Sequence, residues 1–306
     1  MTVGGNSPLS PAAASWPRIR CPTIMPPPML IAMDAGLSSA NNSPLSVPAA
    51  VAPFTLVDGD VASGLVIVCD HADNRVPAEY GDLGLPAAEF TRHIAYDPGA
   101  AAVTRRLAAR LGAPAVLSTF SRLLIDPNRG EDDPTLIMRL SDGAVVPGNA
   151  GVDGGERARR IARFHAPYHV AIDAAIDRAI AAGHVPAIFS VHSFTPVWRG
   201  VPRPWHAGVL WDADPRLAVP LIAALRADAA LVVGDNEPYA GALFGDTLHR
   251  HATTRGLAHA LIEIRQDLIA DEAGIAGWVA RLAAMLTDLN RDAELHQIRH
   301  YGPRSA

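Results

Sequence analysis

The stretch GLVIVCD, residues 64–70, decides the fold, because five apolar residues in succession run directly into an acidic one. A strand that is apolar on both faces belongs inside a sheet that helices cover on both sides. Similar apolar runs recur from residue 54 onward and alternate with alanine-rich amphipathic segments, a pattern typical of α/β proteins. The lengths of chain between the runs are very unequal, which favours a mixed sheet over a uniformly parallel one.

The same patterns place the individual elements. Strands are predicted at residues 65–69, 115–119, 122–126, 187–191, 207–211, 230–233 and 259–264. Helices are predicted at residues 99–111, 155–182, 215–227, 240–254 and 271–289. No glycine-rich GxGxxG motif follows a predicted strand, so a dinucleotide-binding fold is not supported.

Composition limits the classes of protein to which the chain can belong. With 306 residues, 49% of them hydrophobic, the chain can bury the core of one domain of the size that enzymes commonly have. The formal charge of −5 lacks the basic footprint of a nucleic-acid-binding protein. No apolar run is long enough for a transmembrane helix, so we expect no membrane partner. The two cysteines, Cys21 and Cys69, exclude a disulfide framework and favour a reducing compartment, the cytoplasm.

The chain divides into three parts by composition. Residues 1–53 contain ten of the 26 prolines and three charged residues, and we expect them to form a disordered extension or to reflect an upstream start codon, for which Met33 is the natural alternative start. Residues 54–292 form the predicted catalytic domain, and residues 293–306 form a C-terminal tail.

The motif SRLLIDPNRG, residues 121–130, brings two arginines and an amide to the end of an apolar run. If residues 122–126 form a strand, Arg122 and Asp126 share one face of it, and Asn128 and Arg129 follow on the next loop. Guanidinium and amide donors together suit a small carboxylate. The alternative is a surface ion pair between Arg122 and Asp126 that closes a turn after Pro127.

Histidine and glutamate side chains come at the ends of three other predicted strands. His71 and His192 each follow an apolar run, and Glu263 lies near the end of a third. Functional residues of α/β sheets gather at the carboxyl ends of strands. One histidine there is usually structural, but two histidines with a glutamate favour a metal site, in which zinc takes three ligands and a carboxylate accepts a proton from water.

Asp97, in HIAYDPGA, is the third metal ligand that we expect. Its alternative role is the N-cap of the following helix, which aspartate performs well when proline comes next. Asp73 and Asn74 are also within reach of His71. The sequence contains no HExxH or CxxC motif, and it lacks the GxSxG motif of a nucleophilic serine.

The loop GDNEPYAG, residues 234–241, carries Asn236 and Tyr239 and could either turn the chain or cover a ligand. Further along, His249 and His251 lie two positions apart on a predicted helix, so they diverge and cannot both face one site.

Six blocks of the sequence, taken in order, resemble the N-formylglutamate amidohydrolase family over about residues 65–285. These blocks are VCDHADNRVP, HIAYDPGA, SRLLIDPNRG, SVHSF, GDNEPYAG and RHATTRGLAHALIEIRQD. The resemblance implies a three-layer α/β/α fold with a mixed central sheet, of the phosphorylase/hydrolase type, similar to zinc carboxypeptidases and aspartoacylase. It also implies release of formate from N-formyl-L-glutamate.

The wider zinc-hydrolase pattern implies a role for each site residue. His71 and His192 resemble the histidine ligands, Arg122 the arginine that polarises the scissile carbonyl, and Glu263 the general base. Asn128 and Arg129 resemble the pair that holds the substrate α-carboxylate. The chain departs from carboxypeptidases, which carry HxxE, because Asn74 stands where that glutamate would be. The carboxylate ligand must therefore come from elsewhere, and Asp97 is our substitute.

The sequence thus predicts an amidohydrolase with a divalent metal, zinc, acting on a small anionic amino-acid derivative. We expect Asn236, Tyr239 and His251 to contribute to substrate binding, with Tyr239 or His251 on the side-chain carboxylate. Two alternatives stay open: a hydrolase for another N-acyl amino acid or a carboxypeptidase-like substrate, and a carboxylate-binding protein that has lost its metal. The number of subunits is unknown.

Overall fold

The computed structural model describes residues 52–302, so the predicted extension at residues 1–53 falls almost wholly outside the described residues. Met33 and Cys21 also lie outside them. Residues 293–302, part of the predicted tail, include a short 3-10 turn, Ala293–His296, in which Leu295 is buried.

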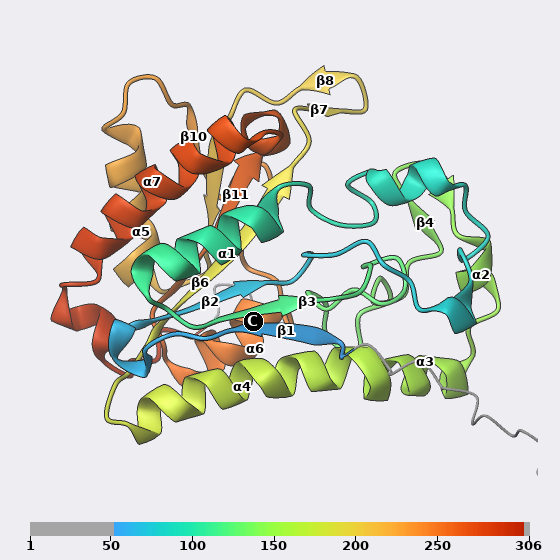
Figure 1. Cartoon of the computed structure of the whole chain (residues 1–306), viewed down its shortest axis with the longest axis horizontal. Coiled ribbons are helices and arrows are strands. Elements are labelled where there is room, and N and C mark those ends of the chain that lie inside the picture. Colours follow the sequence, from blue (N-terminus) through green and yellow to red (C-terminus); the bar gives the residue numbers. More distant parts are fainter. Residues whose placement is uncertain (1–51, 303–306) are drawn as a thin grey trace, which may run out of the picture. The chain divides into compact units, whose positions relative to one another are not determined.

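A seven-stranded sheet forms the centre of the domain, in the order β1-β3-β2-β6-β11-β9-β10 (Figure 1). Its strands are β1 (Phe54–Val57), β2 (Leu65–Cys69), β3 (Ala115–Ser118), β6 (Ala187–Phe194), β9 (Ala207–Leu210), β10 (Val233–Asp235) and β11 (His259–Arg265). β1 runs antiparallel to β3, and β9 antiparallel to β11, whereas the other neighbours are parallel. The prediction of a mixed sheet is confirmed.

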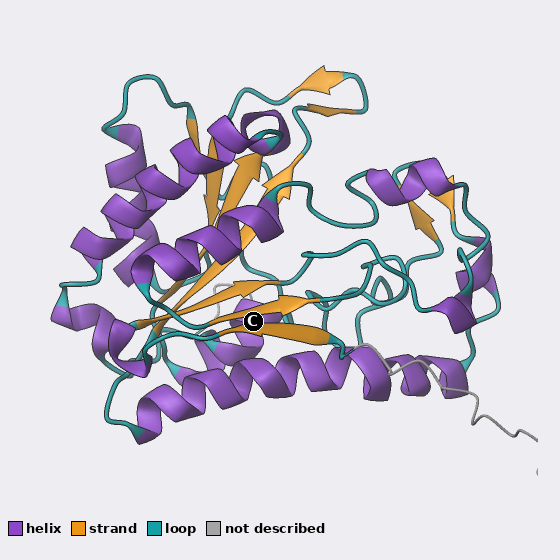
Figure 2. Ribbon diagram, in the orientation of Figure 1, coloured by secondary structure: helices purple, strands orange, loops and turns teal. Residues whose placement is uncertain are grey.

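Helices cover both faces of this sheet, so the predicted three layers are confirmed (Figure 2). The helices α1 (Ala100–Leu111), α5 (Pro215–Arg226) and α7 (Glu272–Leu289) pack on one face. The helices α4 (Ala166–Ala181) and α6 (Thr247–His251) pack on the other. All five residues of β2 are buried, as its run of apolar residues predicted.

Shorter elements extend beyond the sheet on the side of its carboxyl ends. They are the helices α2 (Pro147–Ala150) and α3 (Gly154–Arg160) and the hairpins β4 (Leu140–Ser141)–β5 (Ala144–Val145) and β7 (Val197–Trp198)–β8 (Val201–Pro202). The sequence patterns missed both hairpins and β1, because two to four residues are too few to show a period.

The predicted strand at residues 122–126 is wrong, because this segment forms a turn. Its backbone groups bond to other loops: Arg122 N–H donates to Ala95 O, and Asp126 N–H donates to Leu136 O. Leu123, Leu124 and Ile125 are nevertheless fully buried. The apolar run therefore reflects burial, which periodicity alone cannot distinguish from a strand. The strand predicted at residues 230–233 begins later, as β10.

Two predicted helices also need correction. The segment 155–182 is helical, but a π turn, Ile161–His165, separates α3 from α4 and the Ala166 N–H bonds back to Ile161 O. Pro167 lacks the N–H that a regular helix needs there, which explains the wider turn. Only Thr247–His251 of the segment 240–254 is α-helical, because Gly245 has a left-handed φ of 79° and the Asp246 side chain caps the helix at His249 N–H.

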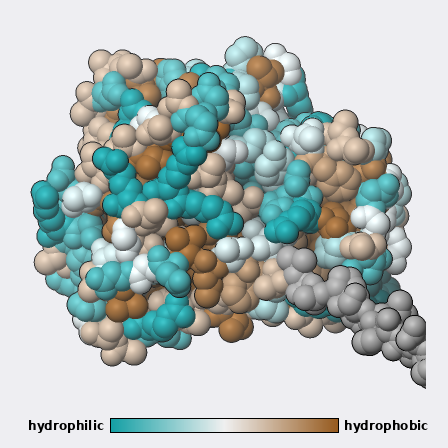
Figure 3. All heavy atoms as spheres, in the orientation of Figure 1, coloured by the Kyte–Doolittle hydropathy of each residue, from teal (hydrophilic) through white to brown (hydrophobic). Residues whose placement is uncertain are grey.

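Hydrophobic residues on the face shown in Figure 3 are interspersed with hydrophilic ones. Among the described residues, no helix combines the length and apolar character needed to cross a bilayer.

Candidate active site

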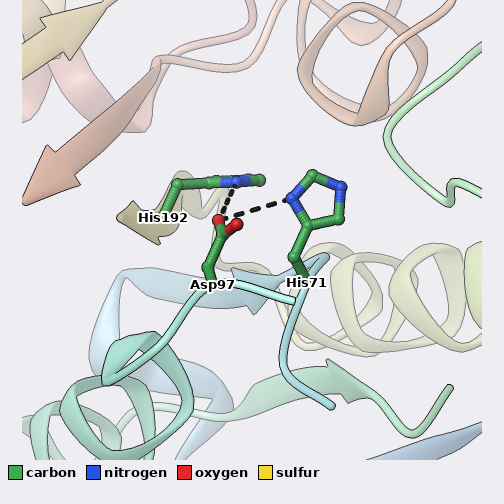
Figure 4. A group of neighbouring side chains, drawn as sticks. All are labelled: His71, Asp97 and His192. Carbon is green, nitrogen blue, oxygen red and sulfur yellow. Dashed lines mark hydrogen bonds and ion pairs between the residues drawn. The ribbon is translucent and has the colours of Figure 1, made fainter. Parts of the chain in front are cut away.

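Two histidines and an aspartate converge at the carboxyl ends of the central strands (Figure 4). His71 follows β2, His192 lies in β6, and Asp97 lies on the loop before α1. Asp97 Oδ2 is 2.9 Å from His192 Nδ1 and 3.4 Å from His71 Nδ1. All three side chains are buried. Both imidazoles therefore direct the same ring nitrogen toward one carboxylate.

A second carboxylate holds the outer nitrogen of each imidazole. His71 Nε2 is 2.8 Å from Asp126 Oδ1, and His192 Nε2 is 2.9 Å from Asp70 Oδ2. Asp70 is fully buried and also accepts hydrogen bonds from the hydroxyl groups of Tyr168, Ser190 and Thr247. A carboxylate behind each ring orients the histidine, so each Nε2 is engaged by the outer aspartate and each Nδ1 faces Asp97.

The electrostatics of the cluster favour ionised carboxylates. Burial by itself would raise the pKa values of Asp70 and Asp97, but hydrogen bonds and charge interactions with His71 and His192 lower both below their usual range. Burial likewise opposes ionisation of Asp126, and the adjacent Arg122 guanidinium lowers its pKa well below the ordinary value. The centre therefore concentrates negative charge, which a cation would balance.

This donor set fits a zinc ion. Two imidazole nitrogens and one carboxylate oxygen are common zinc ligands, and the three ligand atoms lie within 4.8 Å of one another. The N-cap alternative for Asp97 is wrong, because the N-cap of α1 is Gly99 and no side chain caps that helix. Asn74 turns away and donates to Phe90 O, whereas Asp97 is the carboxylate that lies with the two histidines.

Glu263 lies beside His192 on the neighbouring strand, because the two residues are register partners of β11 and β6. Its Oε2 is buried and has no hydrogen-bond partner within residues 52–302. Burial raises the pKa of this carboxyl to about 7, against the lowering effect of His192. A carboxyl group with such a pKa can both accept and return a proton near neutral pH.

Arg122 lies between two aspartates of the centre. Its Nε and Nη2 donate to Asp126 Oδ2 at 3.1 and 2.7 Å, and its Nη1 is 3.8 Å from Asp97 Oδ1. The alternative of an Arg122–Asp126 ion pair in a turn thus describes the local structure correctly. The pair is not on the surface, however, since Asp126 is fully buried and Arg122 lines the pocket.

Asn128 and Arg129 both line the same pocket. The backbone N–H of Asn128 donates to Asp126, and its Oδ1 accepts from Thr247 N–H, which orients the side-chain amide. Arg129 donates through Nη1 to Asn128 O and through Nε to Thr135. Asn128 Nδ2 and Arg129 Nη2 donate no hydrogen bond to any acceptor within the described part, so both donors are available to a ligand.

The loop after β10 presents Tyr239 at the pocket wall, but Asn236 does not line the pocket. Asn236 Oδ1 instead accepts from the backbone N–H groups of Trp211 and Gly241, which fixes the loop against β9. Glycine makes this close approach possible: a Cβ on Gly208 would lie 1.8 Å from the backbone oxygen of Glu237.

His251 is not brought into the pocket. It is fully buried between α6 and α4, where Nε2 is 2.7 Å from His169 Nδ1 and Nδ1 is 2.8 Å from Asp173 Oδ1. The predicted contact between His251 and the substrate therefore has no support in the geometry.

The pocket that joins these residues has a volume of ≈360 Å³. Sequence patterns indicated most of its polar lining but missed the outer carboxylates Asp70 and Asp126 as partners of the histidines. Asp70 directly precedes His71 and Asp126 lies four positions after Arg122. The bonds that join these carboxylates to the histidines depend on the tertiary fold. The patterns also missed His93, Trp198 and Asp246 in the lining.

Comparisons with known proteins agree with the fold. A crystal structure of a gene product from Agrobacterium tumefaciens is 35% identical, with a TM-score of 0.73, and the match covers 78% of this chain and 94% of that one. The N-formylglutamate amidohydrolase of Ralstonia eutropha is 24% identical, with a TM-score of 0.55 over 78% of this chain and 97% of that one. A comparison with curated protein sequences gave no match.

The sequence profile of the N-formylglutamate amidohydrolase family matches residues 63–270, more than half of the 306 residues. The family resemblance and the enzyme class expected from the sequence are both confirmed. The chain is an amidohydrolase and belongs to the N-formylglutamate amidohydrolase family.

Proposed function

We propose that the protein hydrolyses the amide bond of an N-acylated acidic amino acid, N-formyl-L-glutamate, in a reaction that depends on a divalent metal, zinc. The observation that carries this proposal is the convergence of His71, Asp97 and His192 beside the unpartnered Glu263 carboxyl in one pocket. Family membership supports the choice of reaction and substrate class.

His71, Asp97 and His192 would hold the metal. When bound, zinc lowers the pKa of a water ligand and polarises a carbonyl oxygen. Asp126 and Asp70 support this role, because each accepts the outer N–H of one histidine and so keeps its Nδ1 directed inward.

Glu263 is the proton carrier of the proposed reaction. Its carboxylate accepts a proton as water attacks the formyl carbon, and it returns that proton to the amine nitrogen as the C–N bond breaks. Formate and L-glutamate are the products. Arg122 stabilises the negative charge that develops on the carbonyl oxygen, for which it has Nη1, the nitrogen without a hydrogen bond in the described part.

Asn128 and Arg129 position the substrate by its α-carboxylate. The free Nδ2 of Asn128 and the guanidinium of Arg129 can donate to the two oxygens of one carboxylate. We also propose a cytoplasmic location, which agrees with the buried free thiol of Cys69.

The test is to purify the full chain, measure its metal content, and assay formate release from N-formyl-L-glutamate. We expect near-stoichiometric divalent metal, loss of activity on chelation, and recovery when zinc is added back. Full activity in metal-free protein would contradict the mechanism. A metal-loaded protein that releases no formate would contradict the substrate.

A further inference from the structure

Three arginines are buried in the described part of the chain, and one of them lacks an acidic partner. Arg160 pairs with Glu156 at 2.7 Å, and Arg216 pairs with Asp214 at 2.6 Å. Arg203, which follows β8, has no carboxylate within 4.0 Å among residues 52–302. A buried charge without a counter-ion is costly, so a cation kept in this state points to an anion that arrives from outside.

Aromatic rings enclose the Arg203 guanidinium beside the pocket. Its central carbon lies 5.0 Å from the ring centroid of Tyr239, 5.2 Å from that of Trp198, and 5.7 Å from that of Phe194. All three rings belong to residues that line the pocket. Cation–π contacts of this kind hold a guanidinium in place without neutralising its charge.

Arg203 acts on the pocket through Tyr239. Its Nη1 donates to the Tyr239 hydroxyl oxygen at 3.0 Å and lies 3.4 Å from the hydroxyl of Thr195. The Tyr239 hydroxyl has no acceptor for its own hydrogen within the described residues. Burial and the charge of Glu263 raise the pKa of Tyr239, so the hydroxyl keeps that hydrogen and stays a donor. A phenol that accepts from a guanidinium is a stronger donor toward an anion.

The substrate class proposed above carries two carboxylates, and the roles assigned so far leave the second one without a partner. Asn128 and Arg129 are assigned to the first, and Asp126 already engages two nitrogens of Arg122. His251, the other candidate for the side-chain carboxylate, lies outside the pocket.

We infer that Tyr239 and Arg203 form an anion subsite that selects substrates with a side-chain carboxylate. Tyr239 donates its hydroxyl hydrogen to that carboxylate, and Arg203 is a positioning residue that orients Tyr239 and supplies the positive charge. This inference rests on the proposed function, since it assigns a partner to the second carboxylate of the same substrate.

The experiment compares N-formyl-L-glutamate with N-formyl-L-glutamine, an uncharged substrate of nearly the same shape, on the full zinc-loaded chain. We expect Arg203→Met and Tyr239→Phe to lower kcat/KM for the glutamate substrate by about 10- to 100-fold, mainly through KM, because a hydrogen bond to a charged group is lost. For the glutamine substrate, kcat/KM of each variant should stay within about threefold of the wild-type value. The ratio of kcat/KM between the two substrates should therefore fall. Arg203→Lys should give an intermediate result, since it keeps the charge but loses the planar fork.

Arg199→Met is the matched control. Arg199 is exposed in the β7–β8 hairpin, and its guanidinium carbon lies 5.5 Å from the ring centroid of Trp198, so this variant removes the same charge from the same region. We expect it to leave the discrimination between the two substrates unchanged. The double variant of Arg203 and Tyr239 should lose little more than either single variant, because the two residues act as one unit.

Unchanged discrimination in a folded Tyr239→Phe or Arg203→Met enzyme would overturn the inference, as would an equal loss on both substrates or an equal effect of Arg199→Met. These outcomes leave the proposed function standing. If the wild-type enzyme cleaves neither substrate, the proposed function itself is wrong. Tyr239→Phe keeps the test decisive if Arg203→Met does not fold.

Discussion

The protein buries two groups of histidines that differ in what surrounds each ring. His71 and His192 lie between carboxylates, with Asp97 on the inner side of both and Asp126 or Asp70 on the outer side. The second group, which we call the imidazole chain, consists of His165, His169 and His251. Its rings bond mainly to one another, at 2.7 Å between His169 and His251 and 3.2 Å between His165 and His169.

The imidazole chain is joined by hydrogen bonds in a line, and of its ring nitrogens His165 Nδ1 is buried without a partner in the described part. His165 Nε2 lies 2.9 Å from Arg129 O, and because a carbonyl only accepts, this nitrogen carries a hydrogen. His169 Nδ1–H then donates to His251 Nε2, and His251 Nδ1–H donates to Asp173. Burial lowers the pKa of His165, and that of His169 well below the ordinary value, so both rings are neutral.

The difference gives a geometric criterion that separates the two proposed ligand histidines from the imidazole chain. Nitrogens that point at one common acceptor, with carboxylates behind them, form a site that attracts a cation. The ring nitrogens of the imidazole chain bond to one another in a line, so they do not direct their lone pairs toward one common point where a cation could bind. Burial is the same in both groups and therefore does not distinguish them.

The largest expected effect comes from replacing one histidine in each of the two groups and comparing the two variants. His192→Gln should abolish zinc binding and lower amidase activity below detection, because a ligand is lost. His251→Gln, at an equally buried position of the imidazole chain, should keep its zinc and its kcat/KM within about threefold, and lose about 1–3 kcal/mol of stability from broken buried hydrogen bonds. Metal analysis, kinetics and thermal unfolding of both variants check this. Equal zinc content in the two variants would remove the distinction.

Glu263→Gln should give the next largest effect. The amide keeps the shape of the side chain but cannot accept a proton, so kcat should fall by roughly 10²- to 10⁴-fold with KM little changed. Zinc content should stay at the wild-type level. The measurement is steady-state kinetics on folded, metal-loaded protein, and a kcat near that of the wild type would end the assignment of Glu263 as the base.

Substitution of the carboxylate beside a histidine in each group tests whether that carboxylate supports metal binding. Asp70→Asn weakens the support of His192, and we expect zinc affinity to fall by about 10- to 100-fold. Asp173→Asn makes the same change beside His251 and should leave zinc affinity unaltered. Competition with a chromophoric chelator measures both values. Similar affinities for the two variants would show that the outer carboxylate does not support a ligand.

The smallest effect concerns stability and pH in the metal-free protein. The pKa of Glu263 is raised from 4.5 to about 7, so the folded state favours its neutral form. The stabilisation from this neutral carboxyl is complete at a pH below 4.5, the pKa of the group in the unfolded chain. It is lost as the pH rises through about 7, the pKa in the folded protein. The melting temperature of Glu263→Gln relative to wild type should therefore increase between these two pH values and then level off. A difference independent of pH would contradict the raised pKa.

The sequence predicts the central sheet well where a strand is buried on both faces. The apolar runs alone predicted β2 and β11, because a central strand covered on both faces buries nearly every residue of such a run. The same rule failed at residues 122–126, where three apolar residues are buried in a turn. Burial determines which residues are apolar, whereas the bonding partner of the backbone determines whether a strand forms.

The candidate site shows the same limit. Strand ends led to His71, His192 and Glu263, because the carboxyl ends of neighbouring strands come together in any α/β sheet. The role of Asp70 was not predictable, since its four hydrogen-bond donors come from distant parts of the chain. His251 was placed in the site by motif alone, although its partner His169 lies 82 residues away.

The seating of the 236–241 loop on Gly208 has a consequence for protein engineering. Glu263, the proposed base, and His192, a proposed metal ligand, stand on the sheet, whereas Tyr239 belongs to a loop that rests on a strand without a side chain at the point of contact. Substrate range could therefore be redesigned by exchanging this loop as a cassette, with Gly208 and the anchor Asn236 retained and the catalytic centre untouched. Any side chain at Gly208 would lift the cassette off the strand and shift every position in it at once.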